Sequence, residues 1–287
     1  MATDPRTRLP DEFAARVRAL ADGARPAQPK HASTVVLLRD VAEDEPGIEA
    51  CLLRRVSTMA FAAGMHVFPG GSVDPADRAG PGDGSDWLGP SPDTWAGLLT
   101  ADDGLARALI CAAVRETFEE SAVLLAGADE HDVADTSDPS WEADRQGLLD
   151  RAFSLSDLLA RRQLRLRADL LRPWAHWVTP EVEPKRYDTR FFVAAMPAGQ
   201  ATRDVGGESD RMVWLRPQEA LDLHEAGGLA MLPPTAFTLA ELTAYSSVNS
   251  VLAAANERDI KPVLPRVVLT GEQAQLLLPT DEGYEHD

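Results

Sequence analysis

Apolar and polar residues alternate along the chain in two rhythms, and each rhythm predicts one type of element. Short runs of β-branched and other apolar residues predict strands, because such side chains fit a pleated, buried surface. Apolar residues three or four positions apart predict helices. The predicted strands cover 33–38, 48–53, 66–69, 174–178, 190–195 and 212–215. The predicted helices cover 11–21, 100–125, 142–152, 156–163, 217–226 and 237–255. Strands interleaved with helices indicate a layered α/β or α+β fold.

The helix predicted over 100–125 carries an apolar stripe and an acidic face. Thr100 and Asp103 form a variant of the capping box, which predicts where this helix begins. At 100° per residue, Ile110, Val114 and Phe118 fall on one stripe that is expected to face the core. The opposite side carries Glu116, Glu119 and Glu120. Grouped carboxylates suit Mg²⁺ or Mn²⁺, although an acidic cluster alone is more often a solvated helix face.

Composition narrows the class of protein. The 287 residues include 46 acidic and 28 basic ones, which gives a net charge of -18, and 44% of the residues are hydrophobic. A folded protein with this charge would repel a phosphate backbone, so bulk nucleic-acid binding is not expected. Cys51 and Cys111 are too few for a disulfide scaffold and are expected to be buried thiols. We find no membrane-spanning run and no signal-peptide core, which predicts a cytoplasmic protein.

Two motifs flank a long insertion and together resemble a known signature. Phe68-Pro69-Gly70-Gly71 follows a predicted strand, and Arg115-Glu116-Thr117-Phe118-Glu119-Glu120 lies in the acidic helix. The pair resembles the Nudix box, G-x5-E-x7-R-E-U-x-E-E-x-G-U, in which U is a bulky apolar residue. Gly71 would begin the box, and the second half matches from Arg115 to Val123.

The match departs from the box pattern at three points. Arg115 lies 44 positions after Gly71, where the compact box needs 14, so 30 residues are inserted. Eight positions before Arg115, where the box has Glu, this chain has Arg107. The glycine near the end of the box is replaced by Ala122, which predicts that the helix continues instead of turning.

Further motifs indicate one branch of the family. Gly64-Met65-His66-Val67 precedes the glycine pair, Trp177-Val178-Thr179-Pro180 and Lys185–Phe192 follow later, and Leu232-Pro233-Pro234-Thr235 opens the last predicted helix. These motifs are similar to the RP2-like coenzyme A diphosphatase branch, which also has an insertion within the box. The resemblance implies an enzyme that hydrolyses a nucleoside diphosphate linked to another moiety, most simply CoA or acyl-CoA. Alternatives are ADP-ribose or a nucleotide sugar, a dinucleoside polyphosphate, and a non-catalytic ligand sensor with the Nudix fold.

The resemblance also implies roles for individual residues. Glu116, Glu119 and Glu120 would bind Mg²⁺ or Mn²⁺, Arg115 would orient them, and Gly70 and Gly71 would let the backbone approach the site. Glu208 is a candidate general base, although a solvated loop carboxylate is its simpler interpretation. A basic cluster is rare in so acidic a chain and favours phosphate binding slightly over plain salt bridges. The cluster contains Lys185, Arg186 and Arg190.

The fold implied by the resemblance is a Nudix-type α/β/α sandwich with a mixed sheet and helical insertions. We expect an N-terminal segment over 1–30, a Nudix domain over 31–230, and a helical extension with an acidic tail over 231–287. The insert, about 72–100, is rich in Gly, Pro and Asp and is expected to be a surface loop that shapes the substrate pocket. The partner expected is a small nucleotide diphosphate, no membrane is expected, and a homodimer is left open.

Overall fold

The structure is a computed structural model that describes residues 11–41, 46–56, 64–79, 84–203, 209–279, 281 and 283–284. The chain divides into two compact units. The larger unit contains 32–175 and 190–260, and the smaller unit contains the N-terminal residues through 31 together with 176–189 and 261–287. The carboxylates of the Nudix-like motif all belong to the larger unit.

Most of the predicted strands and helices are present, and most of these strands are longer than expected, although the one predicted over 66–69 is shorter. The strands are β1 Lys30–Asp40, β2 Ile48–Arg55, β3 His66–Val67, β4 Gly70–Ser72, β5 Trp87–Leu88, β6 Ala126–Gly127, β7 Arg165–Arg167, β8 Arg172–Val178, β9 Tyr187–Ala195, β10 Ser209–Leu215, β11 Pro262–Val263, β12 Arg266–Thr270 and β13 Gln273–Leu277. The α-helices are α1 Asp11–Ala21, α2 Pro92–Leu99, α3 Asp103–Ser121, α4 Ser140–Leu149, α5 Leu155–Arg162, α6 Pro217–Glu225, α7 Pro233–Leu242 and α8 Val248–Ala255.

The main sheet has the strand order β10-β2-β1-β9-β8-β11. The hairpin predicted from the two N-terminal strands is confirmed, because β1 and β2 pair antiparallel with Leu38 opposite Ala50. Since β11 runs parallel to β8, the sheet is mixed, as expected. The short strand β4 pairs with β1 and places Gly70 opposite Thr34. This pairing holds the glycine pair at the surface of the sheet.

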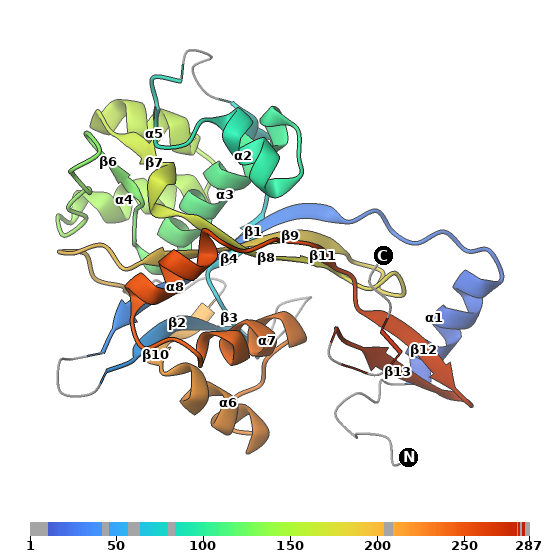
Figure 1. Cartoon of the computed structure of the whole chain (residues 1–287). Helices are drawn as coiled ribbons and strands as arrows, with labels where there is room; N and C mark the ends of the chain where they lie inside the picture. Colours follow the sequence, from blue (N-terminus) through green and yellow to red (C-terminus); the bar gives the residue numbers. More distant parts are fainter. Residues whose placement is uncertain are drawn as a thin grey trace. The chain divides into compact units, whose positions relative to one another are not determined.

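Helix α3 packs on one face of the sheet, where its apolar residues are shielded from water. Alternate residues of β1 face it, so that Val35 and Leu37 join its core cluster. Phe118 of α3 is fully buried and meets the ring of Trp141 edge to face, with ring centroids 5.9 Å apart. Figure 1 shows α2, α4 and α5 gathered around α3 on this side.

The other face of the sheet is covered by α7 and α8 (Figure 1). Trp174 of β8 is fully buried; its indole N–H donates to Glu241 of α7 at 2.9 Å, and its ring meets Tyr245. The carboxylate of Asp40 accepts a hydrogen bond from the backbone N–H of Val248, at the start of α8. Helices on both faces of a mixed sheet confirm the predicted α/β/α sandwich.

Both ends of the predicted long helix differ from expectation. Asp102, not Thr100, caps α3, since its carboxylate accepts from the backbone N–H of Leu105 at 2.8 Å. Thr100 instead ends α2 in the left-handed conformation, with φ 51°. At the other end Ala122 has φ 63° and its N–H donates to Phe118, so the helix stops at Ser121. The prediction that Ala122 would extend the helix was wrong, because alanine can adopt the left-handed turn at a modest cost.

The insert has more structure than a surface loop. It contains a short 3-10 helix, η2 Pro75–Arg78, followed by β5 and α2. Asp77, Trp87 and Trp95 are buried, and the two tryptophans belong to the core cluster around α3. Strand β5 pairs with β7, which also pairs with β6, in a small second sheet. The sequence did not predict this packing, because the buried residues are few and lie among many Gly, Pro and Asp residues.

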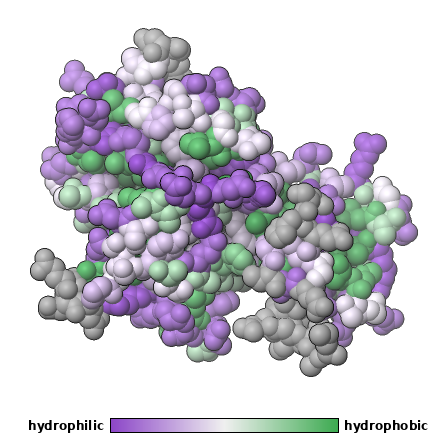
Figure 2. Space-filling model, viewed as in Figure 1, coloured by the Kyte–Doolittle hydropathy of each residue, from purple (hydrophilic) through white to green (hydrophobic). Residues whose placement is uncertain are grey.

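The C-terminal region is only partly helical. The helix expected over 237–255 is two helices, α7 and α8, and three strands follow where a helical extension was expected. In the smaller unit α1 packs on the hairpin of β12 and β13. Within the described part of the chain, no helix is both long and apolar enough to cross a membrane. On the face drawn in Figure 2, hydrophilic residues predominate and hydrophobic ones form small groups between them.

Both cysteines are buried free thiols, as predicted. Cys111 lies on α3 and Cys51 on β2, and both belong to the core between helix and sheet. Burial raises the pKa of the Cys111 thiol to about 12, with the nearby arginines opposing the shift only in part. This thiol therefore packs as a small apolar side chain.

Candidate active site

The last turns of α3 lie against the glycine pair of β4. The backbone N–H of Gly70 donates to the Glu120 carboxylate at 2.8 Å. A Cβ atom added at Gly71 would overlap the carboxylate of Glu116, and one added at Gly70 would collide with the backbone of β1. Glycine is required at Gly70 because β4 lies so close to the backbone of β1, whereas at Gly71 a side chain would displace the Glu116 carboxylate from its place beside Arg115. The structure thus brings together Gly70, Gly71, Glu116 and Glu120, as the sequence predicted.

Arg115 lies at the centre of this site. Its Nη1 donates to Glu116 Oε1 at 2.8 Å and to Glu119 Oε2 at 3.1 Å. Its Nη2 donates to the carbonyl oxygen of Ser72 at 3.0 Å. The predicted pairing with Glu119, one helical turn away, is therefore confirmed, and Glu116 shares the same nitrogen. One guanidinium fixes the orientation of two carboxylates and ties them to the end of β4.

Sequence reasoning missed Asp77. Its carboxylate accepts two hydrogen bonds from Arg115, one from Nε at 3.0 Å and one from Nη2 at 2.9 Å. The Asp77 side chain is only 2% exposed. A third hydrogen bond comes from the backbone N–H of Asp74 at 2.7 Å, as part of the capping box of η2. This bidentate geometry is the strongest pairing that an arginine makes with a carboxylate.

A signal for Asp77 was present in the spacing of the box. Counting six positions forward from Gly71 reaches Asp77, an acid where the pattern has Glu, whereas counting back from Arg115 reaches Arg107. The insertion therefore lies after Asp77. Arg107 forms a salt bridge with Asp86 and lies over the ring of Trp87, 5.4 Å from its centroid. Arg107 seemed to replace the Glu of the box only because we counted back from Arg115 across the insertion.

Charge is concentrated around Arg115. Burial raises the pKa of Glu119 to about 7; Arg115 opposes this shift, while the charges of Glu116 and Asp77 add to it. Burial alone would lower the pKa of Arg115, but its bond to Asp77 and the charges of Glu116 and Glu119 outweigh it and raise that pKa above the ordinary value. Three carboxylates share one guanidinium, so the site carries excess negative charge when all of them are ionised.

The donor set fits a hard divalent cation in its chemistry. All the candidate donors are carboxylate oxygens, the ligand type that Mg²⁺ and Mn²⁺ prefer. Among the described residues no three His, Cys, Asp or Glu side chains converge as a metal centre. Glu116 and Glu119 turn toward Arg115, and Glu120 toward Gly70. Binding of a cation would supply the positive charge that the surplus carboxylates lack.

The other predicted site residues have different surroundings. Arg186, in the smaller unit, is buried and donates to the carbonyl oxygens of Thr179 and Ala27, each at 2.9 Å. Lys185 lies over a neighbouring tyrosine ring. Arg190, in the larger unit, is buried and donates to the carbonyl oxygen of Leu99. These contacts are structural, and substrate binding by the three residues stays a prediction.

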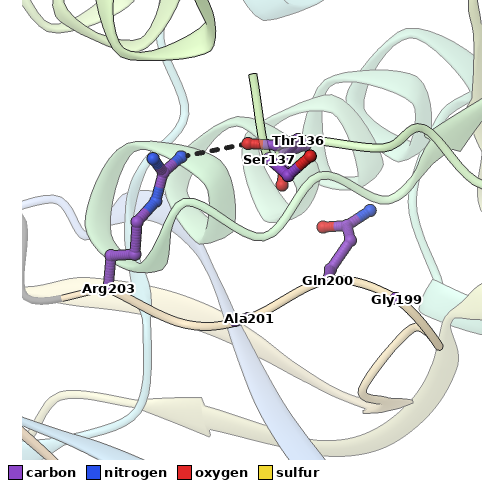
Figure 3. Close-up of a pocket in the computed structure, with 6 residues that line it drawn as sticks. All are labelled: Thr136, Ser137, Gly199, Gln200, Ala201 and Arg203. Atoms are coloured by element: carbon purple, nitrogen blue, oxygen red, sulfur yellow. Dashed lines mark hydrogen bonds between the residues drawn. The ribbon is translucent and has the colours of Figure 1, made fainter. Parts of the chain in front are cut away.

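Glu208, the candidate general base, lies outside the described residues. The described loop before it lines a hollow of about 130 Å³. Figure 3 shows the guanidinium of Arg203 beside the carbonyl oxygen of Thr136, to which it donates at 3.3 Å. The backbone N–H of Arg203 also donates to Ser121, the last residue of α3. The loop is thus attached to the end of the acidic helix, while no carboxylate of that helix lines the hollow.

The comparisons with known proteins agree on the family. Residues 100–242 match the model of the NUDT19 Nudix domain. The acyl-coenzyme A diphosphatase NUDT19 of Xenopus laevis is 25% identical over 278 residues, which cover 83% of this chain and 72% of that protein. The human acyl-coenzyme A diphosphatase NUDT19 is 28% identical over 287 residues, which cover 84% of this chain and 73% of that protein. A crystal structure of a NUDIX hydrolase from Alicyclobacillus acidocaldarius is 30% identical, has a TM-score of 0.66, and covers 79% of this chain and 96% of that one.

The chain therefore belongs to the Nudix hydrolase family, and it is an enzyme of the diphosphatase type. Within that family its similarity is to the branch that contains the NUDT19 proteins, which confirms the branch inferred from the motifs. Nudix hydrolases generally depend on a divalent metal ion. The carboxylates around Arg115 are the described residues whose chemistry suits that requirement.

Proposed function

We propose that this chain hydrolyses the diphosphate bond of CoA or acyl-CoA with Mg²⁺ or Mn²⁺ bound at Glu116, Glu119 and Glu120. The observation that carries the proposal is the arrangement around Arg115, which holds two of these carboxylates beside the Gly70-Gly71 pair that contacts the third. The names of the related diphosphatases support the choice of substrate.

The chain's own residues would orient the reaction, and the cation would supply charge. When bound, a divalent cation neutralises phosphate oxygens and lowers the pKa of a coordinated water. Arg115 holds Glu116 and Glu119 in fixed rotamers, and the Gly70 N–H holds Glu120. Gly70 and Gly71 let β4 lie directly against β1 and the Glu116 carboxylate, because neither carries a side chain. Water would add to one phosphorus and the bridging oxygen would leave on the other phosphate.

The remaining assignments belong to the same proposal. Lys185, Arg186 and Arg190 stay candidates for binding the anionic substrate, and Glu208 for removing a proton from the water. The acidic composition supports a protein without bulk nucleic-acid binding, and a cytoplasmic location is part of the same proposal.

A substrate panel tests the proposal. The purified chain is incubated with CoA, acetyl-CoA, ADP-ribose, NADH and a dinucleoside polyphosphate, each with Mg²⁺ or Mn²⁺, and the products are identified by mass spectrometry. Cleavage of acetyl-CoA should give adenosine 3′,5′-bisphosphate and acetyl-phosphopantetheine. Preferred turnover of ADP-ribose or of the dinucleoside polyphosphate would replace the CoA assignment. Tight binding of one compound without any turnover would instead indicate a ligand sensor.

A further inference from the structure

The C-terminal end of α3 is held by a side chain from another helix. The last carbonyl groups of a helix have no partner within it. Ala122 turns the chain out of α3, and the N–H of Val123 donates to the Ser121 hydroxyl at 3.3 Å. The carbonyl oxygen of Glu119, which a longer helix would pair with that N–H, instead accepts from Nη1 of Arg145 at 2.8 Å. An arginine of α4 therefore replaces the missing helical hydrogen bond at one of the proposed metal ligands.

Arg145 is itself fixed and shielded from water. Its side chain is only 3% exposed. Its Nε, at 3.0 Å, and its Nη2 donate to the carboxylate of Glu142, one turn earlier on α4, in bidentate geometry. These hydrogen bonds hold the pKa of Glu142 below its usual value, so the carboxylate stays ionised at neutral pH. Because the planar guanidinium is bound along one edge by two bonds, its Nη1 is directed at the carbonyl of Glu119.

The charge of Arg145 also matters at this end of α3. The carbonyl end of a helix is negative, and basic residues in the last turn normally compensate for it. The last turn of α3 has no basic residue and carries Glu119 and Glu120 instead. Arg145 brings a positive charge to that turn from α4, while Arg115 binds the Glu119 carboxylate. One arginine thus holds the backbone of Glu119 and another holds its side chain.

We propose that Arg145 is a positioning residue for the diphosphatase reaction, which fixes the last turn of α3 by holding the carbonyl of Glu119. Movement of that turn would separate the Glu119 carboxylate from Arg115 and the Glu120 carboxylate from the N–H of Gly70. Helix α4 is then part of the support for the catalytic carboxylates. The inference rests on the proposed function of Glu119 and Glu120 as metal ligands, and Arg145 is assigned no direct contact with the cation or the substrate.

The test compares Arg145→Met with Arg162→Met, which remove the same group from neighbouring helices. Arg162 of α5 is the matched control, because its polar partners, Asp144 and Ser140, both lie in α4 and its guanidinium lies over the ring of Trp141, 4.2 Å from the centroid. For each variant we would measure the melting temperature, kcat and KM for the substrate that the wild type turns over, and the Kd for Mn²⁺ without substrate.

The two variants should differ in catalysis even where they lose similar stability. Partners that orient metal ligands typically contribute about ten- to a hundredfold, so Arg145→Met should lower kcat about tenfold or more and raise the Mn²⁺ Kd about tenfold. KM should stay within about threefold of the wild-type value, because no substrate contact is removed. Arg162→Met should leave both kcat and the Mn²⁺ Kd within about threefold of wild type, whatever its melting temperature.

Arg145→Lys covers the case in which Arg145→Met does not fold. Lysine keeps the charge but lacks the planar fork that binds Glu142 and the Glu119 carbonyl together, so kcat should fall about three- to tenfold, with weaker Mn²⁺ binding. Wild-type kcat and Mn²⁺ affinity in Arg145→Lys and in any folded Arg145→Met would overturn the proposal, as would equal losses in Arg145→Met and Arg162→Met. Turnover by the wild type is measured in the same assay, so the proposed function is judged separately.

Discussion

Burial of Glu119 beside two other carboxylates is the most costly feature of the site at the scale of single residues. Its side chain is 9% exposed and shares Arg115 with Glu116 and Asp77. A buried carboxylate normally needs a full complement of partners, because desolvation disfavours its charge. This strain without a cation is typical of residues that are kept for function rather than for stability.

Replacing the ligand carboxylates should separate activity from stability. Glu119→Gln and Glu120→Gln should each lower turnover about a hundredfold or more, since each removes a charged oxygen ligand while keeping the side-chain shape. Neither change should lower the free energy of unfolding much, and without metal Glu119→Gln should be more stable than the wild type at neutral pH, because it removes a buried charge. Activity close to wild type in both variants, at the same metal concentration, would contradict the ligand assignment.

Phe118→Ala is the matched change on the opposite side of α3. The ring is fully buried against Trp141, so its removal should cost about 3–5 kcal/mol in the free energy of unfolding measured in urea. The remaining folded enzyme should keep a nearly normal kcat. A loss below about 1 kcal/mol would mean that the core can collapse around the missing ring, contrary to the packing described.

Glu119 also predicts how stability changes with pH in the absence of metal. The pKa of Glu119 is raised from 4.5 to about 7 in the folded state. Glu119 therefore contributes most to the free energy of unfolding below about pH 4.5, where it is protonated in both states. This contribution, about 3 kcal/mol, is lost as the pH rises to about 7. Unfolding of wild type and Glu119→Gln should be compared across that window. A constant difference between the two proteins would show that the pKa of Glu119 is not raised.

At the scale of elements, hydrophobic periodicity predicted the positions of α3 and of the main strands, because burial of an apolar face determines both. The ends of α3 were predicted less well. Thr100, Asp102 and Asp103 all have side chains that can cap a helix, and only the three-dimensional path of α2 decides among them. The Asp77 to Arg115 contact bridges 38 positions, so periodicity could not show it, and only the box spacing counted forward from Gly71 indicated Asp77.

The left-handed turn at Thr100 gives a prediction about the α2–α3 junction. A β-branched residue at φ 51° is strained, and this one is exposed, so it gains little from packing. Thr100→Gly should raise the free energy of unfolding by about 0.5–1 kcal/mol, net of the greater freedom of glycine in the unfolded chain. Thr100→Ala, which keeps a Cβ, should change it much less. Destabilisation by Thr100→Gly would mean that the threonine side chain makes a stabilising contact.

At the scale of the whole molecule, the sequence predicted the sandwich and the family but not the division into two units. The smaller unit combines three segments that are far apart in the chain, and its β12–β13 hairpin follows the last predicted helix. These two strands have only five residues each, and such short runs give a weak periodic signal, which explains why they were missed. The motifs predicted individual site residues, which periodicity could not, because the box specifies both residue type and spacing.

The net charge of -18 makes local charge compensation necessary for binding an anionic diphosphate. A cation at the acidic end of α3 would provide it, and such a cation would bind the folded state selectively. Selective binding stabilises a protein by about 2.7 kcal/mol at a hundred times Kd, which for a chain of this size is a rise of a few degrees in melting temperature. General screening of charge also stabilises an acidic protein, so NaCl at equal ionic strength is the control.

The melting temperature with and without Mn²⁺ is the measurement that tests the metal site most directly, because it needs no substrate. We predict that Mn²⁺ raises the melting temperature of the wild type more than NaCl does. Glu116→Gln should lose most of this rise, whereas Glu130→Gln, which removes the same charge from an exposed loop, should keep it. Equal shifts in the wild type and both variants would show that the ions act as general counterions, and would contradict the assignment of Glu116, Glu119 and Glu120.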